Sequence, residues 1–218
     1  MTTGAVSVEA PSFAERAYEI IRDRLVMLEI RPGTPINDEH LAAELGFGRT
    51  PVREALKRLE RERLVVAYPR RGTFATEVNI TDLGHITEVR QQLEPVAAAA
   101  AARRATAADR AGLRSLAAVL RDTGRGTVST DLMRLDMKVH RAIYAATQNP
   151  FLEDTLVHYD NLATRIWGLF LNRLPGLAGH VEEHGALLDA VAGGDPDRAA
   201  ELAGAHVAHF EQAVRAAL

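Results

Sequence analysis

Two helical patterns separated by only three residues constrain the first third of this chain more than any other feature. A helix pattern over Glu39–Leu45 stops at Gly46-Phe47-Gly48. A further helix begins between Gly48 and Pro51, because proline is tolerated in a first turn whose amides have no intrahelical acceptor. A tight turn between two helices predicts a helix-turn-helix unit.

The flanking segments extend this unit at both ends. Ser12 lies three residues before Glu15, a capping box that opens an earlier helix, which ends at Arg31-Pro32-Gly33. After Leu64 the pattern alternates, which predicts two short strands around the basic turn Pro69–Gly72. The order of helix, helix-turn-helix and hairpin predicts a winged helix-turn-helix over residues 12–78, after a flexible arm over 1–11.

The helix after the tight turn carries one basic face. Arg49, Arg53, Lys57 and Arg61 recur every four residues, opposite the apolar positions Val52, Leu56 and Leu59. Arginine can read guanine bidentately, and lysine and helix N-termini hold phosphates, so this face suits a major groove. The alternative is a solvated face in which Arg58 and Arg63 pair with Glu54, Glu60 and Glu62.

Charge and composition favour the DNA-binding alternative. The 218-residue chain has a net charge of -3, yet Arg49–Arg71 holds eight basic and three acidic residues. Arg70 and Arg71 at the hairpin tip suit phosphates or a minor groove. The chain has no cysteine, which excludes disulfides, a thiolate nucleophile and cysteine-ligated zinc. Without a signal peptide pattern or a membrane-length apolar run, we expect a cytoplasmic protein with no membrane partner.

From Thr81 onward only helices are predicted. A linker over residues 79–81 leads into an all-α domain over 82–218, so the whole chain is expected to be mainly α with two domains. The six helices are expected at Asp82–Arg104, Thr106–Arg121, Thr130–Thr147, Phe151–Asn172, Leu177–Val191 and Pro196–Ala217.

The helical domain contains a set of residues with metal-ligand chemistry. Asp136 and His140 are four apart and share a helix face, while His184 and His206 follow on two further helices. One carboxylate and three imidazoles suit zinc first, with nickel, manganese or iron as alternatives. Imidazole binds metal only when neutral, so affinity is expected to fall below about pH 6.5. The competing interpretation is an ordinary surface pair of Asp136 with His140.

Particular runs of the first domain resemble the GntR-type transcription regulators. They include Leu41–Gly46, Arg49–Leu56 (RTPVREAL), Leu64-Val65 and Arg71-Gly72, and the resemblance covers nearly all of residues 13–78. Two positions depart from the family pattern. Gly48 stands where a serine or threonine commonly caps the recognition helix, and Arg63 stands at a usual glycine. The expected DNA-binding residues are Arg49, Thr50, Arg53, Lys57, Arg70, Arg71 and Gly72.

The second half resembles the all-helical FCD effector domain of the FadR-like branch. This resemblance implies a metal held by Asp136, His140, His184 and His206, and a small organic acid as effector. It also implies that Arg90 and Asn149 bind this ligand, with His180 and His209 at the rim. For Arg90, a clamp on the ligand's carboxylate and an intrahelical pair with Glu94 are equal alternatives.

Two function classes follow. The first is a homodimeric regulator that binds an inverted-repeat operator in double-stranded DNA under control of an organic acid. The second is a metal-dependent enzyme that acts on a small carboxylate and has an appended basic domain. We expect no enzyme, because the sequence shows no general base beside the ligand set, no nucleophile motif and no glycine-rich phosphate loop.

Overall fold

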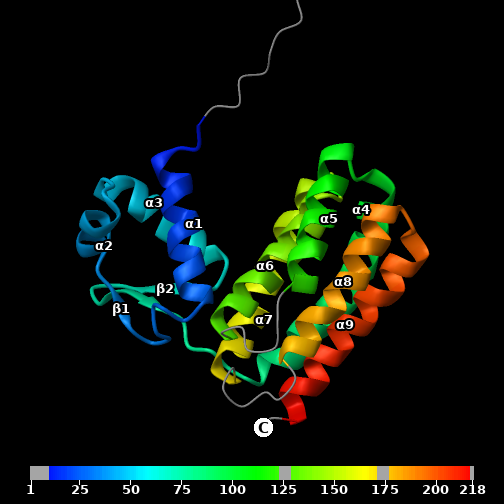
Figure 1. Cartoon of the computed structure of the whole chain (residues 1–218). Coiled ribbons are helices and arrows are strands. Elements are labelled where there is room, and N and C mark those ends of the chain that lie inside the picture. Colours follow the sequence, from blue (N-terminus) through cyan, green and yellow to red (C-terminus); the bar gives the residue numbers. More distant parts are fainter. Residues whose placement is uncertain (1–9, 123–128, 171–176, 217–218) are drawn as a thin grey trace, which may run out of the picture. The chain divides into compact units, whose positions relative to one another are not determined.

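The computed structural model describes residues 10–122, 129–170 and 177–216 (Figure 1). The chain divides into two compact units, Met1–Glu77 and Val78–Leu218. Most of the expected arm, residues 1–9, lies outside the described residues, as do the ends of the predicted helices at Leu171, Asn172 and Ala217. Each unit is described below by itself.

The first unit is a winged helix-turn-helix, as the sequence predicts. Its helices are α1 (Phe13–Val26), α2 (Asp38–Leu45) and α3 (Arg49–Arg61). The Ser12 side chain caps α1 by accepting from the backbone N–H of Glu15, and Gly46 ends α2 in the left-handed conformation (φ 68°). The apolar faces of α1 and α3 form the core, where Ile21, Leu25, Val52 and Leu59 are fully buried.

The sheet of this unit has one strand more than expected. Strands β2 (Val65–Tyr68) and β3 (Gly72–Ala75) form the predicted hairpin, and β1 (Pro35–Ile36) pairs antiparallel with β3, giving the order β1-β3-β2. Both predicted strands are thus confirmed, and β1 is an additional strand that the sequence analysis did not predict. A two-residue strand is too short for any alternation, and its proline is acceptable only because β1 lies at an edge.

The junction from α3 to the hairpin holds a non-glycine residue in a glycine conformation. Arg63 has φ 61°, and the amides of Arg63 and Leu64 donate to the carbonyls of Glu60 and Leu59. These two hydrogen bonds form a Schellman motif, whose left-handed residue is usually glycine. Arg63 occupies the position where the family pattern has glycine, so the backbone keeps the glycine geometry without the glycine.

Arg63→Gly is therefore expected to unfold with a free energy roughly 1 kcal/mol higher than Arg63→Ala, because the Cβ penalty of the left-handed conformation disappears. This difference is measured by urea unfolding of the full chain, monitored with a spectroscopic signal that reports on the first unit. The matched pair Glu54→Gly and Glu54→Ala, at an exposed position inside α3, should show the opposite order by a similar amount. The same order at both positions would contradict strain at Arg63.

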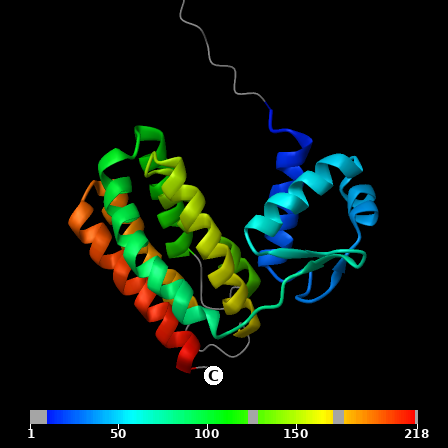
Figure 2. The same cartoon turned by 180° about the vertical axis from the view of Figure 1, so that it is seen from behind.

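The second unit is an all-helical bundle (Figure 2). Its helices are α4 (Asp82–Arg104), α5 (Ala107–Asp122), α6 (Ser129–Ala145), α7 (Pro150–Phe170), α8 (Leu177–Gly193) and α9 (Pro196–Ala216). The predicted elements are thus confirmed with shifts of one or two residues at most ends. Asp195 caps α9 by accepting from the amide of Arg198, as its place before Pro196 predicts.

Small side chains hold α4 close to α9, and both views show the two helices side by side (Figures 1 and 2). Ala97, Ala98, Ala101 and Ala102 of the alanine run are at most 1% exposed. A Cβ built on Gly204 would lie 3.5 Å from Pro95 Cγ, ordinary contact distance. The alanine run is therefore a packing surface. Among the described residues, no helix is both long and apolar enough to cross a membrane.

Candidate nucleic-acid interface and candidate metal centre

Helix α3 presents the predicted basic face to solvent. Arg49, Arg53, Lys57 and Arg61 are exposed, while Val52 and Leu59 on the opposite face are fully buried. Thr50 is exposed in the first turn. Gly48 caps the helix without any side-chain hydrogen bond, as its lack of a side chain requires. The packed back fixes the orientation of the basic front.

The alternative interpretation, in which arginines of α3 pair with glutamates, applies to Arg58, which lies outside the basic stripe. Arg58 pairs with Glu15 at 3.1 Å and with Glu62 at 3.3 Å, and its guanidinium lies 3.6 Å from the centre of the Tyr18 ring. The Tyr18 hydroxyl donates to Glu62, so this cluster ties α1 to α3. Arg58 is therefore structural, and the stripe from Arg49 to Arg61 lies apart from it.

Two arginines of the basic face contact the start of α2, which the sequence did not predict. Arg53 Nε donates to Asp38 Oδ2 at 2.5 Å, and Arg49 lies 3.7 Å from both Asp38 and Glu39. The hydrogen bond from Arg53 lowers the pKa of Asp38 below its usual value, so this carboxylate is ionised at neutral pH. The side chains of Arg49 and Arg53 stay 50% and 59% exposed.

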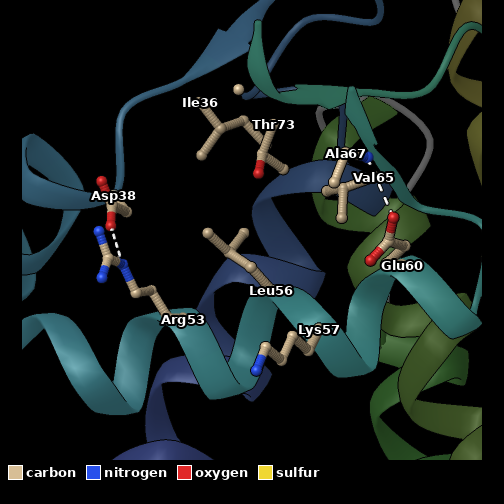
Figure 3. A pocket seen from close by; sticks show the side chains of 10 residues that line it. Ile36, Asp38, Arg53, Leu56, Lys57, Glu60, Val65, Ala67 and Thr73 are labelled. Atoms are coloured by element: carbon tan, nitrogen blue, oxygen red, sulfur yellow. Dashed lines mark hydrogen bonds and ion pairs between the residues drawn. The ribbon is translucent and has the colours of Figure 1, made fainter. Parts of the chain in front are cut away.

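A hollow of about 390 Å³ lies beside this pair (Figure 3). Its lining draws on five elements, with Ile36 from β1, Asp38 from α2, Arg53 and Lys57 from α3, Val65 and Ala67 from β2, and Gly72 and Thr73 from β3. Three of the seven predicted DNA-binding residues, one of them from the wing, thus line this hollow. Arg53, Lys57 and Gly72 belong to both the predicted set and this lining.

The wing tip has the tight geometry that its sequence predicts. Arg70 (φ 64°) and Gly72 (φ 94°) are left-handed, and the Arg71 amide donates to the Tyr68 carbonyl at 3.1 Å. The Arg71 guanidinium lies 5.6 Å from the centre of the Tyr68 ring. Arg70 and Arg71 are both exposed at the tip of the hairpin.

In the second unit, the four predicted metal-ligand residues meet inside the bundle. Asp136 and His140 come from α6, His184 from α8 and His206 from α9. One ligand atom from each lies within 4.8 Å of all the others, and the four residues are at most 3% exposed. The alternative of a surface pair between Asp136 and His140 is therefore wrong, because both side chains are buried.

The Nδ1 atom of each of the three histidines has a hydrogen-bond partner. His184 Nδ1 faces the Val181 carbonyl at 3.3 Å, and His206 Nδ1 faces the Glu183 carboxylate at 3.3 Å. Both partners only accept hydrogen bonds, so each Nδ1 carries the hydrogen and each Nε2 keeps a free lone pair. His140 Nδ1 lies 3.1 Å from the Tyr144 hydroxyl, and its Nε2 faces His184 Nε2.

The candidate ligand atoms of His140, His184 and Asp136 lie close together. His140 Nε2 lies 3.2 Å from His184 Nε2, and Asp136 Oδ1 lies 3.6 Å from His184 Nε2. Asp136 Oδ1 is buried without a hydrogen-bond partner among the described residues. A buried carboxylate oxygen is costly when unsatisfied, and facing lone pairs repel unless a proton or a cation lies between them. These residues therefore fit a divalent metal ion.

Burial shifts the proton equilibria of this centre. Loss of solvation lowers the pKa values of His184 and His206 well below the usual value, so both imidazoles are neutral at neutral pH. Loss of solvation also raises the pKa of Asp136 to about 7, against the opposing effect of His140. The imidazoles of His184 and His206 can therefore bind a cation at neutral pH, whereas the Asp136 carboxyl is partly protonated there.

The two histidines expected at the rim have different surroundings. The His180 ring stacks on His206 with centroids 4.1 Å apart and contacts Trp167 edge-on, and burial lowers the pKa of His180 to about 3. His209 is exposed and lies 3.0 Å from Glu183, the carboxylate that also faces His206. Glu183 is thus a neighbour of the centre that the sequence analysis did not single out.

The two residues expected to bind an organic acid have structural partners here. Arg90 Nε donates to Glu94 at 2.5 Å, its Nη2 lies 3.4 Å from Asp160, and its side chain is 4% exposed. The intrahelical pair with Glu94, one of the two alternatives, is therefore present. Asn149 caps α7, since its Oδ1 accepts from the amides of Phe151 and Leu152.

Comparison with known proteins agrees with both units. The model described as "Bacterial regulatory proteins, gntR family" matches residues 13–75, and the "FCD domain" model matches residues 85–209. The "Nta operon transcriptional regulator" of Aminobacter aminovorans is 31% identical over 190 residues, which are 86% of this chain and 88% of that protein. The "Uncharacterized HTH-type transcriptional regulator YdhC" of Bacillus subtilis is 30% identical over 149 residues, 66% of this chain and 65% of that protein.

Solved structures share the fold. Escherichia coli McbR/YncC superposes with a TM-score of 0.82 at 22% identity, covering 95% of this chain and 99% of that one. A GntR regulator from Rhodococcus sp. RHA1 gives a TM-score of 0.70 at 21% identity, with 95% and 100% covered. The two domain matches and the similarity to the Aminobacter aminovorans regulator together establish the family of this chain. The chain belongs to the GntR family of DNA-binding transcription regulators and carries an FCD domain.

Proposed function

We propose that this regulator binds its operator under control of a small organic acid, which reaches a divalent ion held by Asp136, His140, His184 and His206. The observation that carries this proposal is the convergence of these four buried side chains, in which the Nε2 atoms of His140 and His184 face each other at 3.2 Å. Zinc is the first expectation, and nickel, manganese and iron accept the same nitrogen and oxygen ligands.

When bound, the ion supplies a Lewis-acidic centre that takes a carboxylate oxygen from the ligand. The residues around it fix the ligand set. Tyr144 and the Val181 carbonyl orient His140 and His184, and Glu183 orients His206, which keeps the side chains from turning away. We propose that Arg90 and Asn149, whose present partners are Glu94 and the first turn of α7, contribute to ligand binding as the family resemblance implies.

On DNA, we propose a homodimer on an inverted repeat. One recognition helix covers about half a turn of major groove, so two copies related by a twofold axis read two half-sites about 10 base pairs apart. Arg49, Thr50, Arg53 and Lys57 of α3 enter the groove, and Arg70, Arg71 and Gly72 of the wing contact the backbone. The exposed basic face of α3 and the left-handed tip of the wing support this assignment.

Selection of duplexes from a random-sequence pool by the metal-loaded full chain should enrich an inverted repeat. In parallel, a thermal-shift screen of mono-, di- and tricarboxylic acids should reveal acids that stabilise the metal-loaded protein, and these acids should change its affinity for the selected duplex. Enriched duplexes without twofold symmetry would contradict the dimer. Equal stabilisation of the metal-stripped protein by the same acids would contradict a ligand that binds through the ion.

A further inference from the structure

The contact between Asp38 and Arg53 joins opposite charges at the centre of the DNA-facing surface. Arg53 belongs to the middle of the basic stripe and Asp38 to the first turn of α2 (Figure 3). An acidic side chain at such a place is unfavourable for a protein that approaches phosphates, because its charge repels them. The contact of Asp38 with Arg53 therefore cannot be explained by a gain in affinity for DNA of any sequence.

The atoms involved supply that reason. Asp38 takes the Nε–H of Arg53, and none of the described hydrogen bonds of Arg53 uses its terminal nitrogens. Guanine is read by two parallel N–H groups that meet O6 and N7, and the terminal edge of a guanidinium offers such a pair. A carboxylate bound at Nε leaves this edge free and fixes the plane of the guanidinium.

Arg49 lacks such an arrangement. Its contacts with Asp38 and Glu39 run through its terminal nitrogens Nη2 and Nη1 at 3.7 Å, so reading a base would break them. Arg53 can keep its contact with Asp38 while it reads a base. The two arginines are thus not equivalent, although the sequence spacing treats them alike.

From this geometry we infer that Asp38 is the positioning residue that sets base specificity, holding Arg53 with its terminal amino groups presented to one guanine. This inference rests on the proposed DNA-binding role of α3. Asp38 also subtracts charge from the surface, which weakens contact with DNA of any sequence. Both effects increase the difference in binding affinity between operator and non-operator duplexes.

The inference is tested with the full chain on two probes, the duplex enriched by selection and a scrambled duplex of equal length and composition. Asp38→Ala should lower the ratio of the two affinities by about tenfold, the discrimination of one bidentate contact. It should bind the scrambled duplex more tightly than the parent does. Asp38→Asn keeps an acceptor for Nε–H, so it should retain more of the ratio while showing the same gain on the scrambled duplex.

Glu39→Ala is the matched control, since it removes the same charge from the same helical turn, and the described ion pair of the Glu39 side chain is with Arg49. It should keep the parental ratio. In an Arg53→Ala background, Asp38→Ala should cause no further loss of discrimination, because Asp38 acts through Arg53. If Asp38 only stabilised the fold, its loss would lower discrimination in both backgrounds. The inference would be overturned if Asp38→Ala kept the parental ratio of operator to scrambled affinity. It would also be overturned if adding Asp38→Ala to Arg53→Ala lowered this ratio as much as Asp38→Ala does in the parent. A parent that enriches no duplex would instead overturn the proposed function, and this inference with it.

Discussion

Replacing His184 by alanine is expected to abolish stoichiometric binding of a divalent ion, from about one ion per chain to none. His184 is fully buried and its Nε2 lies within 4 Å of both His140 and Asp136, so its loss opens the centre of the ligand set. In the parent, metal at 100 times its dissociation constant should stabilise the second unit by about 2.7 kcal/mol, and this gain should vanish in the variant. Elemental analysis after metal-replete purification and thermal unfolding measure both effects.

The same titration tests the proton equilibrium of the centre. Metal binds the ionised carboxylate, and burial raises the pKa of Asp136 to about 7, so below pH 7 the ion must displace a proton. Affinity should be constant above about pH 8 and fall about tenfold per pH unit below 7. The window thus lies above the value of 6.5 expected from unperturbed histidines, because the pKa values of His184 and His206 are lowered and those imidazoles stay neutral.

His85→Ala serves as the control for this experiment. It removes an exposed histidine of α4 and should leave metal content, unfolding and pH dependence unchanged. Equal metal content in the parent and in His184→Ala would remove His184 from the site. A parent without metal after metal-replete purification would contradict the metal centre as a whole.

Substitution of Arg53 by alanine is expected to cost roughly 1–3 kcal/mol of binding to the selected operator and to relax the preference at one base pair. Arg71→Ala, at the exposed tip of the wing, should weaken binding to all duplexes alike and reduce the slope of log K against log salt by about one. Fluorescence anisotropy at several salt concentrations separates the two effects.

Arg121→Ala provides a charge-matched control, because Arg121 pairs with Asp189 in the second unit. Its affinity and its salt dependence should equal those of the parent. The assignment of α3 as the reading helix fails if the Arg53 variant discriminates among duplexes as well as the parent does. A salt slope that stays the same in Arg71→Ala would remove this arginine from the backbone contacts.

Most helices of this protein follow from patterns that act within a few residues. The capping box at Ser12, the glycine at Gly46 and the Asp195-Pro196 pair each satisfy or end local backbone groups, and the structure has the expected helix ends. Strand β1 escaped prediction because its two residues are defined by their partner β3, which is far away in sequence. Local patterns cannot reveal an element that exists only through a distant pairing.

The candidate sites divide in the same way. The i, i+4 spacing of Asp136 and His140 suggested a candidate metal site only together with the family resemblance, and the same spacing from His140 to Tyr144 carried no signal by itself. Glu183 faces His206 from another helix, so no spacing rule connects the two residues. Asp38 resembles any acidic residue that favours a helix start, and only the structure brings it to Arg53.

The buried polar groups of the second unit have a consequence for the effect of single substitutions. Contacts within 4 Å run from α4 through α6 to α8 and from α4 to α7, and they join Arg90, Glu94, His140, Asp136, His184 and Asp160. Replacing one charged member leaves a buried partner without its countercharge, at a cost of about 3–5 kcal/mol. A single substitution of Arg90, Glu94 or Asp160 is therefore expected to destabilise the second unit, and a second substitution that restores the balance of charge is expected to recover part of the loss.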